Sequence, residues 1–217
     1  MASIMRKPSA SVIFFHGSGD TGPNVLEWVR GLIGRDFNGS HIKYVFPTAP
    51  MQEYTPFDGE MSTVWFNRES VDIAAGEDRS SMSQSYDIAK QLIQHEVDQG
   101  IPHSRIIVGG FSMGGALALH TGYHVTRNLA GVFAHSSFLN RKSVVYESVE
   151  AGSTLPELCM FHGEDDKVVE FQWGRETFDR LQELGVIGTF TSLNDTAHEL
   201  KKSSILEVEQ WILKKLP

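Results

Sequence analysis

The sequence has little cysteine, no long apolar run and no excess of basic residues. Cys159 is the only cysteine among 217 residues, so no internal disulfide can form, which favours a reducing compartment. No stretch approaches the ~18 apolar residues of a membrane span, and residues 1–11 lack the apolar core of a signal peptide. We therefore expect a cytoplasmic location and no stable membrane anchor.

The charge balance is acidic, with 27 Asp and Glu against 19 Lys and Arg and a net charge of -8. Such a chain has no electrostatic attraction to phosphate backbones, which argues against nucleic acid as a partner. The hydrophobic fraction of 41% and the charged fraction of 21% are ordinary for a globular protein. The length suits one domain covering residues 1–217.

Short apolar runs alternate with longer amphipathic ones along the chain. The short runs predict strands at residues 12–15, 42–46, 106–108, 131–134, 158–161 and 188–193. The longer ones predict helices at residues 24–33, 83–99, 114–123 and 199–216, with another ending near residue 185. This alternation predicts an α/β fold with a mostly parallel sheet covered on both faces by helices.

Residues 47–80 interrupt this alternation and are rich in Pro, Gly, Ser, Thr and Met. We expect a long irregular excursion there, with a short strand around residues 64–66. Long loops in compact domains are commonly functional. The aromatic and Met content of residues 53–70 suggests that Trp65 and Phe66 form a wall of a substrate pocket; the alternative is that both are ordinary core residues.

The strongest chemical signal is Gly-Phe-Ser-Met-Gly at residues 110–114, which matches G-x-S-x-G. An apolar run precedes it and a small-residue helix follows, which is the context of a nucleophile elbow. A serine on such a turn projects its hydroxyl above the sheet, and the helix N-terminus places N–H groups beside a developing oxyanion. The motif predicts Ser112 as a nucleophile.

Two glycine-rich segments could instead bind a phosphate or a dinucleotide, but each lacks a residue that such binding requires. Residues 109–116 lack the Lys-Ser/Thr pair of a phosphate-binding loop. Residues 17–22 match G-x-G-x-x-G after the first strand, but no acidic residue ends the next strand to hold a ribose. The same loop instead suits donation of a backbone N–H to an oxyanion, with Ser18 as the best candidate.

A serine nucleophile needs a base, and a fold of this kind places that base late in the chain. His198 is the only one of nine histidines after His162, and it follows the last predicted strand. The orienting acid should follow the preceding strand, where Glu164, Asp165 and Asp166 compete, and spacing alone does not choose between them.

The other histidines offer no better chemistry. His120 and His124 are four apart, but Thr121 stands where a zinc-binding H-E-x-x-H motif needs glutamate. His16 and His162 each precede a glycine at a predicted strand end, and we expect them to hold loops near the site. The proposed chemistry requires no metal and no organic cofactor.

Taken together, these segments resemble the acyl-protein thioesterase and lysophospholipase family. The resemblance rests on residues 16–22, Pro-Thr-Ala-Pro at 47–50, Val-Trp-Phe at 64–66, Gly-Ile-Pro at 100–102, Arg-Ile-Ile at 105–107, residues 109–116, and His-Gly-x-x-Asp at 162–166.

The resemblance implies an α/β-hydrolase fold and a Ser112-Asp166-His198 triad, because the family acid is the fifth residue of His-Gly-x-x-Asp. It also implies oxyanion donors at the backbones of Ser18 and Met113. Most members carry Leu and Gln at these two positions, so the shape of the acyl pocket is expected to differ.

The function that the resemblance implies is cytosolic hydrolysis of thioesters or oxygen esters, including S-palmitoyl cysteine on acylated proteins. Rival interpretations are a carboxylesterase of small esters, a non-catalytic binding protein on a hydrolase scaffold, and a nucleotide-binding oxidoreductase.

Overall fold

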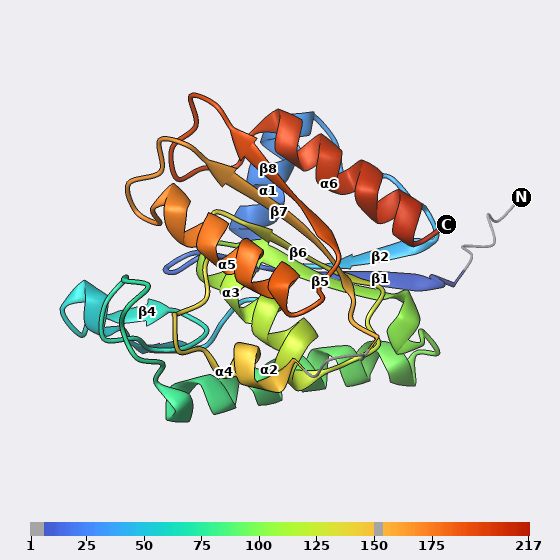
Figure 1. Ribbon diagram of the computed structural model, residues 1–217. Helices are drawn as coiled ribbons and strands as arrows, with labels where there is room; N and C mark the ends of the chain where they lie inside the picture. Colours follow the sequence, from blue (N-terminus) through green and yellow to red (C-terminus); the bar gives the residue numbers. More distant parts are fainter. Residues whose placement is uncertain (1–6, 150–153) are drawn as a thin grey trace, which may run out of the picture.

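The computed structural model describes residues 7–149 and 154–217, and a six-stranded sheet forms its centre (Figure 1). Neighbouring strands pair in parallel in the order β2-β1-β5-β6-β7-β8. They are β1 (Ala10–Phe15), β2 (Ile42–Val45), β5 (Ile106–Phe111), β6 (Gly131–His135), β7 (Glu157–Gly163) and β8 (Gly188–Leu193). The predicted mostly parallel α/β sheet is confirmed.

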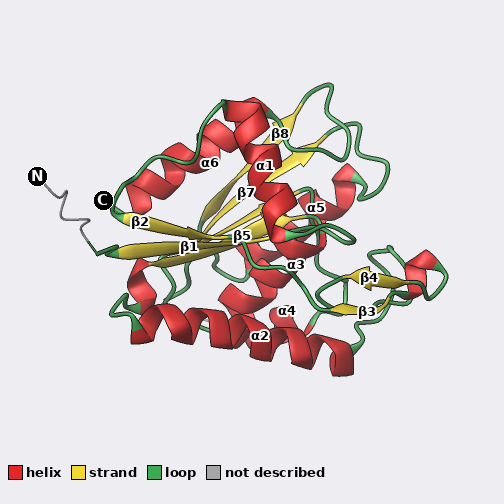
Figure 2. Ribbon diagram, turned by 180° about the vertical axis from the view of Figure 1, so that it is seen from behind, coloured by secondary structure: helices red, strands yellow, loops and turns green. Residues whose placement is uncertain are grey.

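Helices cover both faces of this sheet (Figure 2). One face carries α1 (Gly22–Ile33) and α6 (Lys202–Lys215); the other carries α2 (Arg79–Asp98), α3 (Met113–His120), α4 (Val144–Ser148) and α5 (Phe171–Glu183). Alternate residues of β1 divide between two apolar cores. Val12 and Phe14 pack in the core under α1 and α6, whereas Ile13 and Phe15 pack in the core under α2 and α3. This double coverage explains why the central strands are buried on both sides.

The helix ends follow local chemistry. The Thr21 side chain accepts a hydrogen bond from the N–H of Asn24 at the start of α1, and Gly34 ends that helix with φ 75°. Asp78 caps α2 in the same way. The short helix α4 was not predicted, because five residues are too few to show helical periodicity.

Residues 47–80 leave the main sheet and form a small antiparallel hairpin of β3 (Met51–Glu53) and β4 (Met61–Thr63). A short 3-10 turn, Thr55–Phe57, lies between the two strands. The strand predicted at residues 64–66 is wrong, because pairing ends at Thr63. Trp65 is held in place by a side-chain hydrogen bond instead of strand pairing: its indole N–H donates to the carbonyl of His16 at 2.8 Å.

The parallel sheet gathers the loops of interest at one edge. Ser112 follows β5, Asp166 follows β7, His198 follows β8 and Ser18 follows β1. In a parallel sheet the carboxyl ends of the strands meet at one edge, and ligands bind in the crevice there. Within residues 7–149 and 154–217, no helix combines the length and the apolar character that crossing a bilayer requires.

Candidate active site

Ser112 lies on the tight turn between β5 and α3, with φ 54° and ψ −121°. This conformation is strained for a residue with a side chain. It is held by close backbone packing: a Cβ on Gly114 would lie 2.1 Å from the carbonyl oxygen of Phe15, and one on Gly110 would lie 2.5 Å from the same atom. The two outer glycines of the motif therefore allow α3 to approach β1 and present the Ser112 hydroxyl above the sheet.

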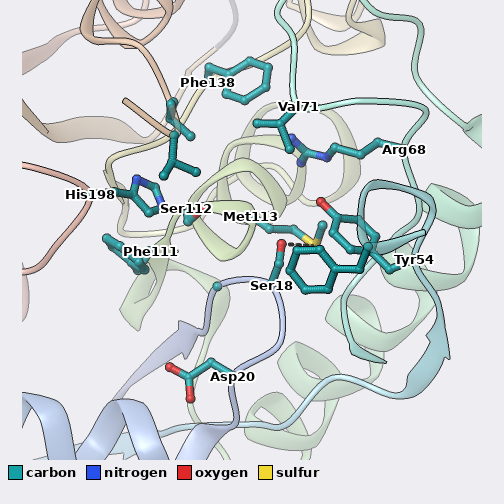
Figure 3. A pocket seen from close by; sticks show the side chains of 14 residues that line it. Ser18, Asp20, Tyr54, Arg68, Val71, Phe111, Ser112, Met113, Phe138 and His198 are labelled. Atoms are coloured by element: carbon teal, nitrogen blue, oxygen red, sulfur yellow. Dashed lines mark hydrogen bonds between the residues drawn. The ribbon is translucent and has the colours of Figure 1, made fainter. Parts of the chain in front are cut away.

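A continuous hydrogen-bond chain links Ser112, His198 and Asp166. The Ser112 hydroxyl lies 3.0 Å from Nε2 of His198, and Nδ1 of His198 lies 2.7 Å from Oδ2 of Asp166. A carboxylate only accepts, so Nδ1 carries the proton and Nε2 is free to accept from the serine. Figure 3 shows His198 directed at Ser112. This is the tautomer that a general base requires.

The structure distinguishes the three carboxylates that the sequence left open. Glu164 and Asp165 are exposed, whereas Asp166 is buried. The second oxygen of Asp166 accepts the N–H groups of Val168 and Val169, each at 2.9 Å. Burial by itself would raise the pKa of Asp166, but these bonds and the one from His198 outweigh it and hold the pKa below its usual value. Asp166 is thus a fixed anion behind His198.

His162 supports the acid loop from the core. Its Nε2–H donates to the carbonyl of Val169 at 2.8 Å, and the same nitrogen lies 3.6 Å from Asp166. Burial lowers the pKa of His162, so the ring stays neutral near pH 7. A Cβ on Gly174 of α5 would lie 2.1 Å from this ring, which shows how closely the helix packs on it.

The loop after β1 comes beside the helix that follows Ser112. The Ser18 hydroxyl contacts the sulfur of Met113 at 3.7 Å, so the two residues are neighbours. Met113 is the first residue of α3, and its N–H has no acceptor within the helix. Both Ser18 and Met113 line the cavity above Ser112 (Figure 3).

His16 fixes this loop to the segment that precedes the hairpin. The N–H of Ala49 donates to His16 Nε2 at 2.9 Å, so the proton is on Nδ1, which donates to the carbonyl of Gly17 at 2.6 Å. Burial lowers the pKa of His16, which keeps the ring neutral and this arrangement intact. The expectation that His16 holds a loop near the site agrees with these contacts.

A cavity of about 200 Å³ opens above Ser112. Its walls are mostly apolar and include side chains that sequence reasoning had not singled out, namely Tyr54, Phe57, Arg68, Val71, Phe111, Phe138, Val168 and Val169. Most of these belong to loops whose meeting depends on the fold. The local signal available in the sequence was Arg68, a charged residue that closely follows Trp65 and Phe66.

The expected pocket wall of Trp65 and Phe66 needs correction. Neither side chain lines the cavity, and they are only 1% and 4% exposed within the main core. Trp65 packs edge-on against Phe15 of β1 and against His16, so its ring faces the sheet. The alternative interpretation, that both are core residues, describes their positions.

His120 and His124 take part in a polar network rather than a metal centre. His120 lies 3.2 Å from Glu77 through Nε2 and 2.9 Å from the Tyr86 hydroxyl through Nδ1, whereas His124 bonds Ser148. In the part of the chain that the structure describes, no group of three or more His, Cys, Asp or Glu residues could hold a metal ion.

The sheet, its helices and the turn that carries Ser112 define an α/β-hydrolase fold, and the class of protein is a serine hydrolase. The chain belongs to the Phospholipase/Carboxylesterase family, whose pattern it matches over residues 2–216.

Relatives and solved structures agree with this assignment. The chain is 44% identical to mouse lysophospholipase-like protein 1 over 210 residues, covering 96% of this chain and 88% of the relative. It is 36% identical to acyl-protein thioesterase 1 homolog 1 of Dictyostelium discoideum, covering 96% of this chain and 92% of that relative. The crystal structure of Zea mays acyl-protein thioesterase 2 superimposes with a TM-score of 0.83 at 26% identity, covering 97% of this chain and 95% of that one.

Proposed function

We propose that this chain hydrolyses acyl thioesters or esters through a Ser112-Asp166-His198 triad and an acyl-enzyme intermediate. The observation that carries the proposal is the hydrogen-bond chain from Ser112 through His198 to Asp166, with distances of 3.0 and 2.7 Å. The reaction needs no metal or organic cofactor, because the base and the orienting acid are both side chains of the chain itself.

In the first step Ser112 Oγ attacks the acyl carbonyl carbon while His198 Nε2 takes the hydroxyl proton. The N–H groups of Ser18 and Met113 stabilise the tetrahedral oxyanion, and loss of one such donor costs ~10²–10³ in rate. His198 then protonates the departing thiolate or alkoxide, which leaves the acyl group on Ser112. In the second step water, deprotonated by His198, attacks the acyl-enzyme. The tetrahedral intermediate then collapses as His198 returns the proton to Ser112 Oγ, which releases the acid and restores the serine.

The substrate that the relatives favour is an acylated protein, since one relative is named an acyl-protein thioesterase homolog; a cytoplasmic location is part of the proposal and rests on the sequence. The size of the cavity favours a second candidate, a carboxylesterase of short acyl chains. Drug-sized ligands occupy pockets of about 300–1,000 Å³, and this one measures about 200 Å³. A longer chain would have to continue over Phe57 and Val168, which line the cavity and are 45% and 53% exposed.

The nucleophile is tested by Ser112→Ala, with Ser83→Ala as control because Ser83 is exposed on α2. We expect Ser112→Ala to abolish ester hydrolysis and fluorophosphonate labelling without lowering the unfolding midpoint, and the control to retain both activities. Labelling that persists in Ser112→Ala refutes the assignment.

The two substrate candidates are separated by kcat/KM across thioesters and oxygen esters from acetyl to palmitoyl. A depalmitoylase-like enzyme gives rates that rise with chain length, whereas a short-chain esterase loses rate once the chain exceeds the cavity. A profile indifferent to length argues that no defined acyl channel exists.

A further inference from the structure

Arg68 is a buried cation with no hydrogen-bond or ion-pair partner among residues 7–149 and 154–217. The residue is 9% exposed, and its Nε is shielded from solvent with no hydrogen-bond partner among the residues that the structure describes. Burial lowers the pKa of Arg68, yet an arginine side chain stays protonated near pH 7. A buried charge normally has a partner, because removing an ion from water without one is costly.

Two aromatic rings flank the guanidinium group. Its central carbon lies 5.0 Å from the ring centre of Phe66 and 5.3 Å from that of Phe138. Phe138 is held in turn by the ring of Trp173, at 5.2 Å. Such contacts stabilise a cation and orient its plane, but they satisfy none of its N–H groups. The rings therefore position the guanidinium and leave its N–H groups unbonded; because Nε is shielded, a ligand in the cavity reaches the terminal nitrogens.

The nearby acidic groups form no hydrogen bond with Arg68 in the described part of the chain, although Glu77 Oε1 is buried without a hydrogen-bond partner of its own. Glu77 and Tyr54 are the ionisable groups that act on Arg68 electrostatically. Glu77 accepts the N–H of Val144 at 3.0 Å and lies 3.2 Å from His120. Asp20, the carboxylate that lines the cavity, accepts the N–H of Thr21 at 2.8 Å. In Figure 3 Asp20 lies beyond the Ser18 loop, away from Arg68.

Arg68 lines the same cavity as Ser112 and His198. Figure 3 shows its guanidinium end beside Val71, pointing toward the side of the cavity where Ser112 and His198 lie. The residue that precedes it is anchored: the N–H of Asn67 donates to Ser81 of α2, and the Asn67 side chain bonds Thr55. A rigid, unpaired cation thus faces the place where a substrate must bind.

From this geometry we propose that Arg68 binds a carboxylate at the far end of the substrate's acyl group, so that short acyl chains ending in an anion are preferred. The proposal rests on the function proposed above and specifies its substrate class. A guanidinium presents N–H donors in a planar fork that matches a carboxylate. We assign the carboxylate to the acyl part because that part remains on Ser112 through both chemical steps, whereas the leaving group departs after the first.

The test compares two benzyl esters of equal shape, the monoester of glutaric acid and the benzyl ester of its monoamide, each corrected for hydrolysis without enzyme. The wild type should favour the anionic ester in kcat/KM by about 30-fold or more, the loss expected when one partner of a buried charge pair is removed. In Arg68→Met the ratio should fall to about one or below.

Arg175→Met is the matched control. Arg175 also lies over two phenylalanine rings, Phe178 and Phe190, at 5.6 and 5.2 Å, but it is exposed and pairs with Asp179. This variant should keep the wild-type ratio. A wild type that prefers the amide, or a ratio unaltered in Arg68→Met, overturns the proposal.

A second pair of esters carries the carboxylate on the leaving group and a neutral acyl chain. If Arg68→Met changes the ratio of kcat/KM between charged and neutral esters only for this pair, the assignment to the acyl part is wrong. Failure of the proposed function is recognised separately, because the hydrolysis of neither ester would then be lost in Ser112→Ala.

Binding without turnover provides an independent measurement. Free glutarate should slow fluorophosphonate labelling of Ser112 in the wild type and in Arg175→Met, but not in Arg68→Met. The thermal midpoint of Arg68→Met should equal or exceed that of the wild type, because methionine removes an unpaired buried charge and keeps the apolar contacts. Protection that survives the substitution, or a clear fall in midpoint, would assign Arg68 a purely structural role.

Discussion

Replacing Asp166 with asparagine tests the site most directly, because the substitution keeps the shape and changes the tautomer of the base. An asparagine oxygen can still accept the N–H groups of Val168 and Val169, which lie 2.9 Å from Oδ1. The amide nitrogen then replaces Oδ2 and faces Nδ1 of His198, formerly a donor at 2.7 Å. Two donors cannot face each other, so the imidazole moves its proton to Nε2 and loses the ability to accept from Ser112.

The expected loss is about 10⁴-fold in kcat, the effect of a base held in the wrong tautomer, which corresponds to ~5 kcal/mol of barrier. KM should change little, because Asp166 does not line the cavity. The assay is steady-state hydrolysis of a short ester at pH 7.5, with thermal unfolding to verify the fold.

Asp165→Asn is the matched control for this experiment, since Asp165 is the adjacent carboxylate but is exposed. It should retain activity within about threefold. An Asp166→Asn enzyme within tenfold of the wild type, or a larger loss in Asp165→Asn, would refute the role given to Asp166.

Two further predictions concern stability. Gly114→Ala should lower both the unfolding midpoint and turnover, because its Cβ would lie 2.1 Å from the carbonyl oxygen of Phe15. Gly31→Ala on α1 is the control: its Cβ would have nothing within 4 Å, so it should stabilise the protein by ~0.5–1 kcal/mol. Equal midpoints for the two variants would contradict this reasoning. Burial lowers the pKa of His135 from 6.5 to about 3, so the unfolded chain binds the extra proton between these values and stability falls as the pH drops through this window. Urea unfolding at pH 7 and pH 5 should show ~2 kcal/mol of this loss, reduced in His135→Gln; an unchanged pH dependence would exclude His135 as its source.

Much of the site could be predicted because its signals are local. The G-x-S-x-G motif between an apolar strand and a small-residue helix indicated Ser112, since the strained turn requires those glycines within five residues. His198 was indicated by its place after the last strand. Glu164, Asp165 and Asp166 could not be separated by spacing, because their difference is burial and hydrogen bonding to the loop that follows; only the resemblance to a family favoured Asp166.

The pocket could not be predicted in the same way. Trp65 and Phe66 have the composition of a pocket wall, but the path of the chain after β4 turns them into the core. Arg68 and Phe138 are 70 residues apart and meet only because the loops after β4 and β6 converge over the sheet.

The sequence by itself determined the class of fold, through short buried strands alternating with amphipathic helices. It also indicated Ser112 and His198 as the candidate nucleophile and base, through motifs whose chemistry is contained in a few neighbouring residues. The tertiary structure decided which carboxylate bonds His198, which side chains line the cavity above Ser112, and that one arginine in that lining has no hydrogen-bond partner among the described residues. Burial and pairing depend on residues that are distant along the chain, and folding alone brings those residues into contact.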